Sequence, residues 1–200
     1  MVDSFYKKKL DTIKTEIPVA VIQNFLLIQE KFYKRKVSVW IDNTEMTASD
    51  FKPYRYEFIK TITPSNPELN PELYLYVTFE ADPGLGNKVE RGSVNGLNVN
   101  RGVHLRYLET VYEETLRSEY KIKHKYVGNG LKMYVLLLAS EVIYDSQTKT
   151  NLCSISKVKP SDFAILTKEF AKIFRKDPDY WNLHVEKLNS LAASYVSLTA

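Results

Sequence analysis

Apolar side chains recur with two different periods along this chain, and the two periods separate helices from strands. Helical spacing runs through residues 5–17 and, after Pro18, through residues 21–33. It returns in residues 103–118 and again in two segments near the C-terminus. Pro160 and Pro178 open those two segments, and proline suits the first turn of a helix. The pattern predicts N-terminal, central and two C-terminal helices.

Alternating apolar and polar positions predict six strands, three before the central helix and three after it. Residues 73–80 alternate most regularly, with apolar side chains on one face and Tyr74 and Tyr76 on the other. This order predicts an α+β fold with a mainly antiparallel sheet, built from two three-stranded meanders that pack against the helices. The six segments are residues 37–42, 54–63, 73–80, 119–127, 131–144 and 151–158.

Residues 82–102 follow neither period. They hold five of the seven glycines, several asparagines and few apolar side chains. The composition predicts a long, Gly/Asn-rich loop within a single domain of residues 1–200, and long loops of this kind are usually functional or disordered. We expect the loop to become ordered on a protein partner, with Lys88, Arg91, Leu97 and Arg101 as the partner-binding residues.

Composition fits a globular protein, with 44% hydrophobic and 26% charged residues in a chain of 200. No apolar run is long enough to span a bilayer, and residues 1–9 lack the apolar core of a signal peptide. The sequence therefore predicts a cytoplasmic protein, or a virion protein if the source is viral, with no membrane partner. Cys153 is the single cysteine and is predicted to be a small buried side chain.

No motif identifies a reaction. Gly84-Leu85-Gly86 lacks the lysine and hydroxyl residue of a phosphate-binding P-loop, and Val89 breaks the longer dinucleotide-binding glycine pattern. The three histidines, His104, His124 and His184, have no metal-ligand spacing. We therefore predict no catalytic residue, no metal and no cofactor.

A basic stripe suggests another function. The formal net charge is +4, and Lys121, Lys123 and Lys125 share one face of the strand predicted over 119–127. Such a face, together with exposed Tyr74 and Tyr76, could contact nucleic acid through phosphates and stacked bases. A solvated lysine face on an edge strand is the alternative interpretation.

A weaker nuclease pattern overlaps the basic stripe. Glu119 and Lys121 on one strand face, with Asp82 as a third ligand, resemble the arrangement of metal-dependent nucleases. A Glu-x-Lys sequence also occurs often by chance, and the alternative is a solvated strand end.

The leading hypothesis is a non-catalytic structural or assembly protein that acts through protein–protein contacts or self-association, including as a virus or phage virion component. It rests on 14 tyrosines, the Gly/Asn-rich loop and a tandem Asn-Pro-Glu-Leu repeat over residues 66–73. The alternative is a nucleic-acid-binding protein, including a metal-dependent nuclease, that uses the lysine-rich strand.

Overall fold

The computed structural model describes residues 19–51, 54–63, 72–82, 84, 86, 88–99, 101–155 and 158–199, with side chains as far as residue 195. The helix predicted over residues 5–17 lies outside these residues, as does most of the Asn-Pro-Glu-Leu repeat. The predicted α+β class is confirmed. None of the helices among the described residues is long and apolar enough to cross a membrane.

Five strands form the main sheet in the order β3-β4-β8-β5-β6. The neighbouring pairs are antiparallel except β5 and β8, which run parallel. The parallel β5–β8 pair makes the sheet mixed, and the place of β8 between β4 and β5 distinguishes it from two consecutive meanders. Its strands are β3 (Tyr56–Ile62), β4 (Leu73–Ala81), β5 (Val89–Val94), β6 (Leu97–Val99) and β8 (Leu131–Leu138).

Two smaller sheets extend the fold. β10 (Asn151–Ile155) pairs with β7 (Arg101–Gly102) on one side and with β9 (Val142–Tyr144) on the other. β1 (Ser38–Ile41) and β2 (Thr44–Thr47) form a separate hairpin, which is followed by a short 3-10 helix, η1 (Ala48–Phe51). The hairpin turn at Asp42 and Asn43 has positive φ at both residues, as two-residue hairpin turns usually require.

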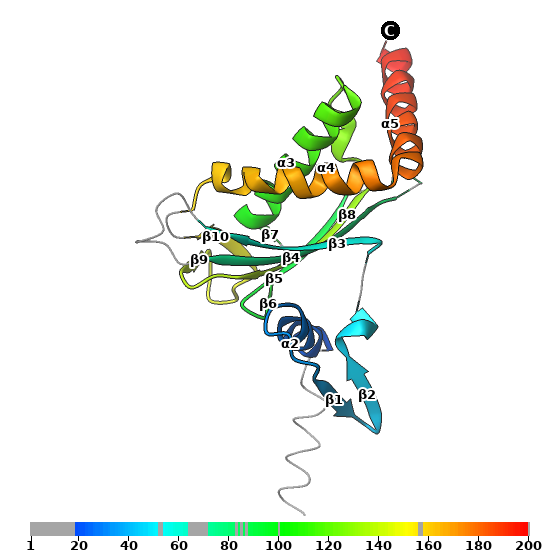
Figure 1. The fold of residues 1–200 in the computed structure, drawn as a ribbon. Coiled ribbons are helices and arrows are strands. Elements are labelled where there is room, and N and C mark those ends of the chain that lie inside the picture. The colour runs from blue at the N-terminus through cyan, green and yellow to red at the C-terminus, as the bar shows by residue number, and fades with distance from the viewer. Residues whose placement is uncertain are drawn as a thin grey trace, which may run out of the picture.

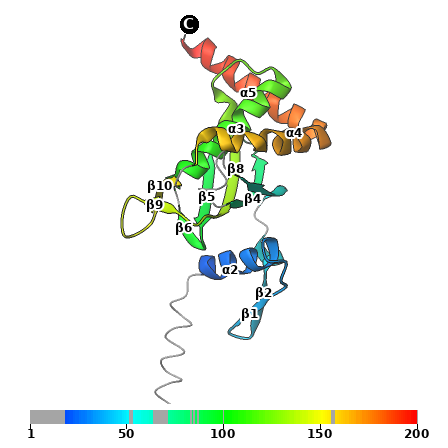
Figure 2. The ribbon, with the colours of Figure 1, turned by 60° about the vertical axis from the view of Figure 1, so that its left-hand side comes forward.

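Helices cover both faces of the main sheet. α3 (Val103–Tyr120), α4 (Thr167–Lys176) and α5 (Pro178–Thr199) lie on one side, and α2 (Val19–Lys31) with the β1–β2 hairpin lies on the other (Figure 1). The turned view shows the same division, with the C-terminal end of α5 leading away from the sheet (Figure 2). A 3-10 helix, η3 (Pro160–Leu166), leads into α4, and another, η2 (Tyr126–Gly128), leads toward β8.

The larger core lies between the sheet and the three helices α3, α4 and α5, and it is rich in aromatic rings. Phe79 of β4 is fully buried, with its ring centroid 5.0 Å from that of Phe170 on α4. Tyr112 of α3 and Trp181 of α5 also contact this ring. The regular alternation of β4 correctly predicted the buried apolar face, because every second residue points toward these helices.

A second, smaller core lies on the opposite face of the sheet, under α2. Its buried residues include Leu26 and Leu27 of α2, and Tyr76, Tyr134 and Leu136 of the sheet. Tyr76, predicted to be exposed, is only 1% exposed because α2 covers this face too. The prediction that it stacks on a nucleic acid is therefore wrong.

The prediction of a single irregular loop over residues 82–102 is also wrong. Residues 89–94 form β5, an interior strand of the main sheet, and residues 97–99 form β6 at its edge. Val94 and Val99 are fully buried in the larger core. Gly92 serves close packing, because a Cβ there would lie 2.8 Å from Nε2 of His104 on α3. Glycine and asparagine therefore mark tight packing and turns here.

The strand predicted over residues 119–127 does not form. α3 continues to Tyr120, and Lys121 ends it with a left-handed φ of 56°. The backbone N–H of Ile122 then donates to the carbonyl of Arg117, and the chain passes through η2 into β8. Ile122 is buried between exposed Lys121 and Lys123, and partly buried His124 is followed by exposed Lys125, which accounts for the apparent alternation.

Candidate functional site

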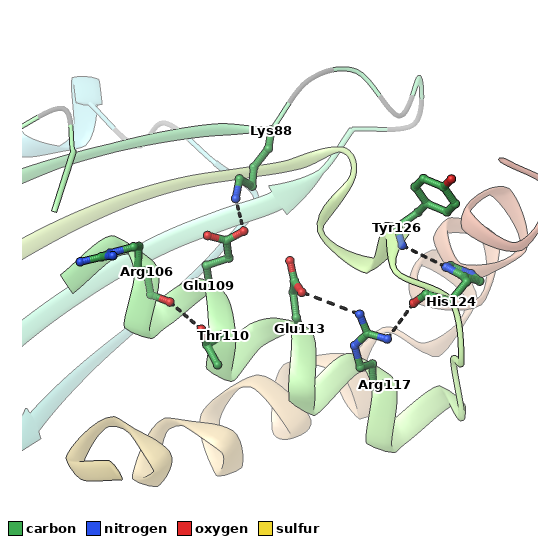
Figure 3. A network of polar contacts seen from close by, with 8 residues as sticks. All are labelled: Lys88, Arg106, Glu109, Thr110, Glu113, Arg117, His124 and Tyr126. Carbon is green, nitrogen blue, oxygen red and sulfur yellow. Dashed lines mark hydrogen bonds and ion pairs between the residues drawn. The ribbon is translucent and has the colours of Figure 1, made fainter. Parts of the chain in front are cut away.

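A network of charged side chains joins the start of β5 to the outer face of α3 (Figure 3). The Nζ atom of Lys88 is bonded to Oε1 of Glu109 and lies 3.7 Å from Oε1 of Glu90. One turn further along α3, a carboxylate oxygen of Glu113 lies 4.0 Å from the guanidinium of Arg117. Spacing of four residues on α3 brings these three helix side chains into one row.

The far end of this network holds the segment that follows α3. Arg117 donates from Nη1 to the carbonyl oxygen of His124 at 2.7 Å, and the N–H of Tyr126 donates to Nδ1 of His124 at 3.3 Å (Figure 3). Gly128 lies directly against Glu113, so any side chain at this position would collide with the carboxylate. The network therefore fixes the path of the chain from α3 to β8.

The carboxyl groups of this network favour proton binding. Burial, and then the negative charge of Glu109, raises the pKa of Glu90 to about 7, although Lys88 opposes the shift. Burial and Glu109 likewise raise the pKa of Glu113. Burial lowers the pKa of Lys88, but its bond to Glu109 and the nearby carboxylates outweigh burial and raise the pKa overall. Glu90 can therefore hold a proton near neutral pH.

Beside the network, an open groove of about 400 Å³ runs along α3. Its walls carry both signs of charge, with arginines at the two ends and carboxylates between them. Across the described parts of the chain, no group of three His, Cys, Asp or Glu side chains is arranged to hold a metal ion. The groove is lined by Arg106, Glu109, Thr110, Glu113, Glu114 and Arg117.

The four residues predicted to bind a partner do not form one surface. Lys88 belongs to the charged network, whereas Arg91 lines a cavity on the α2 side of the sheet. Leu97 is 42% exposed on the edge strand β6. Arg101 lies in β7, which pairs with β10 in a separate sheet. Whether any of them binds a partner stays a prediction.

The three lysines of the predicted basic stripe do not share a strand face. Lys121 caps α3, and Lys123 and Lys125 are exposed in the irregular segment that follows. Tyr74 is exposed, as expected, but its hydroxyl donates to Glu72 and its ring makes an edge contact with Phe32. No continuous basic and aromatic surface results.

The proposed nuclease ligands are also apart. Both carboxylate oxygens of Glu119 accept from Arg175, at 2.8 and 2.6 Å. Asp82 instead pairs with Lys132 at 3.0 Å and accepts from the N–H of Gly84. Glu119 and Asp82 therefore each pair with a different cation and do not meet at one site that could bind a metal.

The histidines and the cysteine have different environments from one another. Burial lowers the pKa of His104 and of His184 to about 4, so both rings are neutral. His124 is bonded through Nε2 to Asn189 at 3.0 Å. Cys153, predicted to be buried, is exposed on β10.

The turn between β9 and β10 is a polar feature whose side chains the sequence analysis did not single out. The N–H of Lys149 donates to the carbonyl of Ser146 at 3.2 Å, and the hydroxyl oxygens of Ser146 and Thr148 lie 2.7 Å apart. Lys149 has a φ of 54° and, in the described chain, forms no ion pair. A cation and neighbouring hydroxyls thus stand on a defined, exposed turn.

Comparison with known proteins finds structures with a similar fold but no protein with a similar sequence. No protein-family model matches the chain, and no curated protein sequence matches it. Among solved structures, the 43K ATPase domain of Thermus thermophilus gyrase B, in complex with an aminocoumarin, matches with a TM-score of 0.63 and 14% identity. That match covers 90% of this chain and 53% of the gyrase chain.

Two further structures show the same likeness. The B-subunit of DNA gyrase from Myxococcus xanthus has a TM-score of 0.53 and 13% identity, covering 75% of this chain and 48% of its own. The topoisomerase IV ATP-binding domain of Francisella tularensis, in complex with a small-molecule inhibitor, has a TM-score of 0.55 and 14% identity, covering 76% and 45%. The chain thus spans about half the length of each of these three structures.

The shared fold contradicts the leading sequence-based hypothesis. A non-catalytic assembly or virion protein, and the alternative nucleic-acid binder with a lysine-rich strand, were both expected from local composition. The fold is instead one found in ATPase domains of gyrase B and topoisomerase IV. The prediction that the protein is not an enzyme is contradicted by the same finding.

Proposed function

We propose that this chain is one part of an ATP-hydrolysing enzyme of the gyrase B and topoisomerase IV type, and that it works together with a second part that holds the nucleotide. The fold match over 90% of this chain, set against 53% of the gyrase ATPase domain, carries the proposal. Because the chain spans about half of that structure, the proposal assigns the rest of the activity to a protein partner or to further polypeptide.

The β9–β10 turn is the part of this chain that we propose to contact the nucleotide. In P-loop NTPases a lysine binds the β- and γ-phosphates and a Ser or Thr hydroxyl holds the accompanying Mg²⁺. Ser146, Thr148 and Lys149 bring these groups together on a turn fixed by hydrogen bonds, so little conformational freedom is lost on binding. Lys149 Nζ lies 5.8 Å from the Tyr144 ring centroid, and a phosphate would compete for this cation.

The charged network of Lys88, Glu90 and Glu109 has a structural role in this proposal. It holds the start of β5 on α3 through the Lys88–Glu109 ion pair. We therefore assign the nucleotide contact to the turn and the support of the sheet to the network.

A binding measurement tests the proposal. The full chain is combined with the ATPase assembly isolated from its source, and amide exchange is followed with and without a non-hydrolysable ATP analogue. We expect residues 145–150 to become protected only when both the second part and the nucleotide are present. Protection by the nucleotide in the isolated chain, or unchanged exchange of the turn in an assembly that binds the analogue, would contradict the assignment.

A further inference from the structure

A second cavity lies on the α2 side of the sheet, away from the β9–β10 turn and from the charged network on α3. Its volume is about 380 Å³, within the range of sites that bind small molecules. α2, β5, β6 and β8 all contribute to its walls. It is lined by Ala20, Gln23, Asn24, Tyr54, Arg91, Gly92, Asn98 and Tyr134.

The floor of this cavity is rigid. Asn24 is 1% exposed and donates from Nδ2 to the carbonyl of Gly96 at 3.0 Å and to Oδ1 of Asn98 at 2.8 Å. The hydroxyl of Tyr134, on the neighbouring strand β8, donates to Oδ1 of Asn24. All the hydrogen-bonding atoms of the Asn24 side chain are therefore used within the protein, and a ligand would meet a preformed surface.

The rim of the cavity offers a different set of groups. Arg91 is exposed and forms no ion pair with any residue that the structure describes. The half-buried ring of Tyr54 stands beside it, and the amide side chains of Gln23 and Asn98 complete the rim. Guanidinium groups bind carboxylates and phosphates in bidentate fashion, and tyrosine rings provide flat apolar contact.

The charges around the rim favour an anion. Burial raises the pKa of Tyr54, the positive charge of Arg91 opposes this, and Glu80 and Lys132 act on the same hydroxyl with opposite signs. Lys132 is already paired with Asp82 at 3.0 Å and lies 3.9 Å from Glu80. Arg91 is thus the cation at this site that the described acidic side chains leave unneutralised.

We propose that this cavity binds a small anion joined to a planar ring, with Arg91 holding the anionic group and Tyr54 contacting the ring. The inference is independent of the proposed function, since it uses none of the residues of the β9–β10 turn. The same chemistry is carried by a nucleoside monophosphate and by an aromatic carboxylate, and the probes below distinguish these two sources.

Calorimetric titration of the full chain with adenosine monophosphate, benzoate and inorganic phosphate tests the proposal. We expect one of the two ring-bearing anions to bind saturably and at least tenfold more tightly than phosphate alone. Replacing Arg91 (Arg91→Gln) should weaken that binding at least tenfold. Filling the cavity from α2 (Ala20→Phe) should abolish it while Arg91 is retained.

Two control variants keep the test specific. Arg101→Gln removes an exposed arginine from the separate β7–β10 pair, and Lys123→Gln removes an exposed lysine from the segment after α3. Both variants should bind the ring-bearing probe within twofold of the original protein. Loss of binding in either control variant would overturn the inference. So would the absence of saturable binding by either ring-bearing anion, or unchanged binding in Arg91→Gln.

Discussion

The two faces of the main sheet are built in opposite ways. Toward α3, α4 and α5 the sheet packs an aromatic core around Phe79, with ring centroids 4.6 to 6.4 Å apart. Toward α2 the core is smaller and contains a buried polar centre at Asn24 and Tyr134, next to an open cavity. The face toward α3, α4 and α5 is filled by the larger core, whereas the face toward α2 contains a cavity of about 380 Å³.

The largest effect should come from the aromatic face. Phe79→Ala removes a fully buried ring and should lower the free energy of unfolding by roughly 3–5 kcal/mol. Leu136→Ala is the matched deletion on the α2 face, where the smaller core should make the loss less. Denaturant unfolding of both variants compares the faces, and a cost for Phe79→Ala within about 0.5 kcal/mol would show that its face is not a core.

A smaller effect should come from the polar centre under α2. Asn24→Leu leaves the hydroxyl of Tyr134 and the carbonyl of Gly96 without their partner, and an unpaired buried polar group costs about 1–3 kcal/mol. The matched control is Gln23→Leu on the cavity rim, which should change stability by less than about 0.5 kcal/mol. Equal unfolding midpoints for the two variants would mean that the Asn24 bonds contribute nothing to this face.

The third effect depends on pH and belongs to the charged network on α3. The pKa of Glu90 is raised from 4.5 to about 7, so the folded protein binds this proton more tightly than the unfolded chain. The stabilising contribution is complete below about pH 4.5 and is lost as the pH rises through 7. Glu90→Gln should therefore reduce the decline in stability between pH 5 and pH 8, by on the order of 1 kcal/mol because Glu90 is only partly buried and solvent screens its charge.

Thermal unfolding of the original protein and of Glu90→Gln at matched pH values measures this difference. Glu114→Gln is the control, since its exposed carboxylate lies on the same helix outside the contacts of Lys88. Identical pH profiles for the original protein and Glu90→Gln would show that Glu90 is ionised throughout.

The smallest effect should come from the exposed lysines after α3. Replacing Lys121, Lys123 and Lys125 together with glutamine should change the free energy of unfolding by less than about 1 kcal/mol, because none of the three is buried. Chemical denaturation checks this, and a larger loss would mean that the left-handed cap at Lys121 depends on the lysine itself.

Sequence alone predicts those strands and helices that have one buried face and one solvent-exposed face. The face of β4 that carries Phe79 was predicted correctly. The other face packs under α2, so the prediction that Tyr76 is exposed was wrong. β5 was missed because Gly92 and Ser93 are small residues chosen for close contact with α3 and β8, and they carry no apolar alternation. Pairing with a distant parallel strand leaves no local signal.

The candidate site is even less visible in the sequence. Lys88 and Glu109 are 21 residues apart and meet only after β5 has packed on α3. Arg91 was identified as a binding residue from its place in a glycine-rich segment, but the cavity beside it needs Asn24 of α2 as its floor. The polar turn of Ser146 to Lys149 lies between the two segments predicted as strands over 131–144 and 151–158, and the contact between its hydroxyl groups emerges only from the hairpin geometry.

ATP turnover by the native assembly tests the central claim most directly. The assembly is isolated from the source of this chain, and its turnover is measured with the original protein and with Lys149→Gln in its place, using Lys123→Gln as the control. The account predicts ATP hydrolysis that falls at least tenfold in Lys149→Gln and is unchanged in Lys123→Gln, with equal melting temperatures. An assembly that contains this chain and hydrolyses no ATP, or one whose turnover is indifferent to Lys149→Gln, would contradict it.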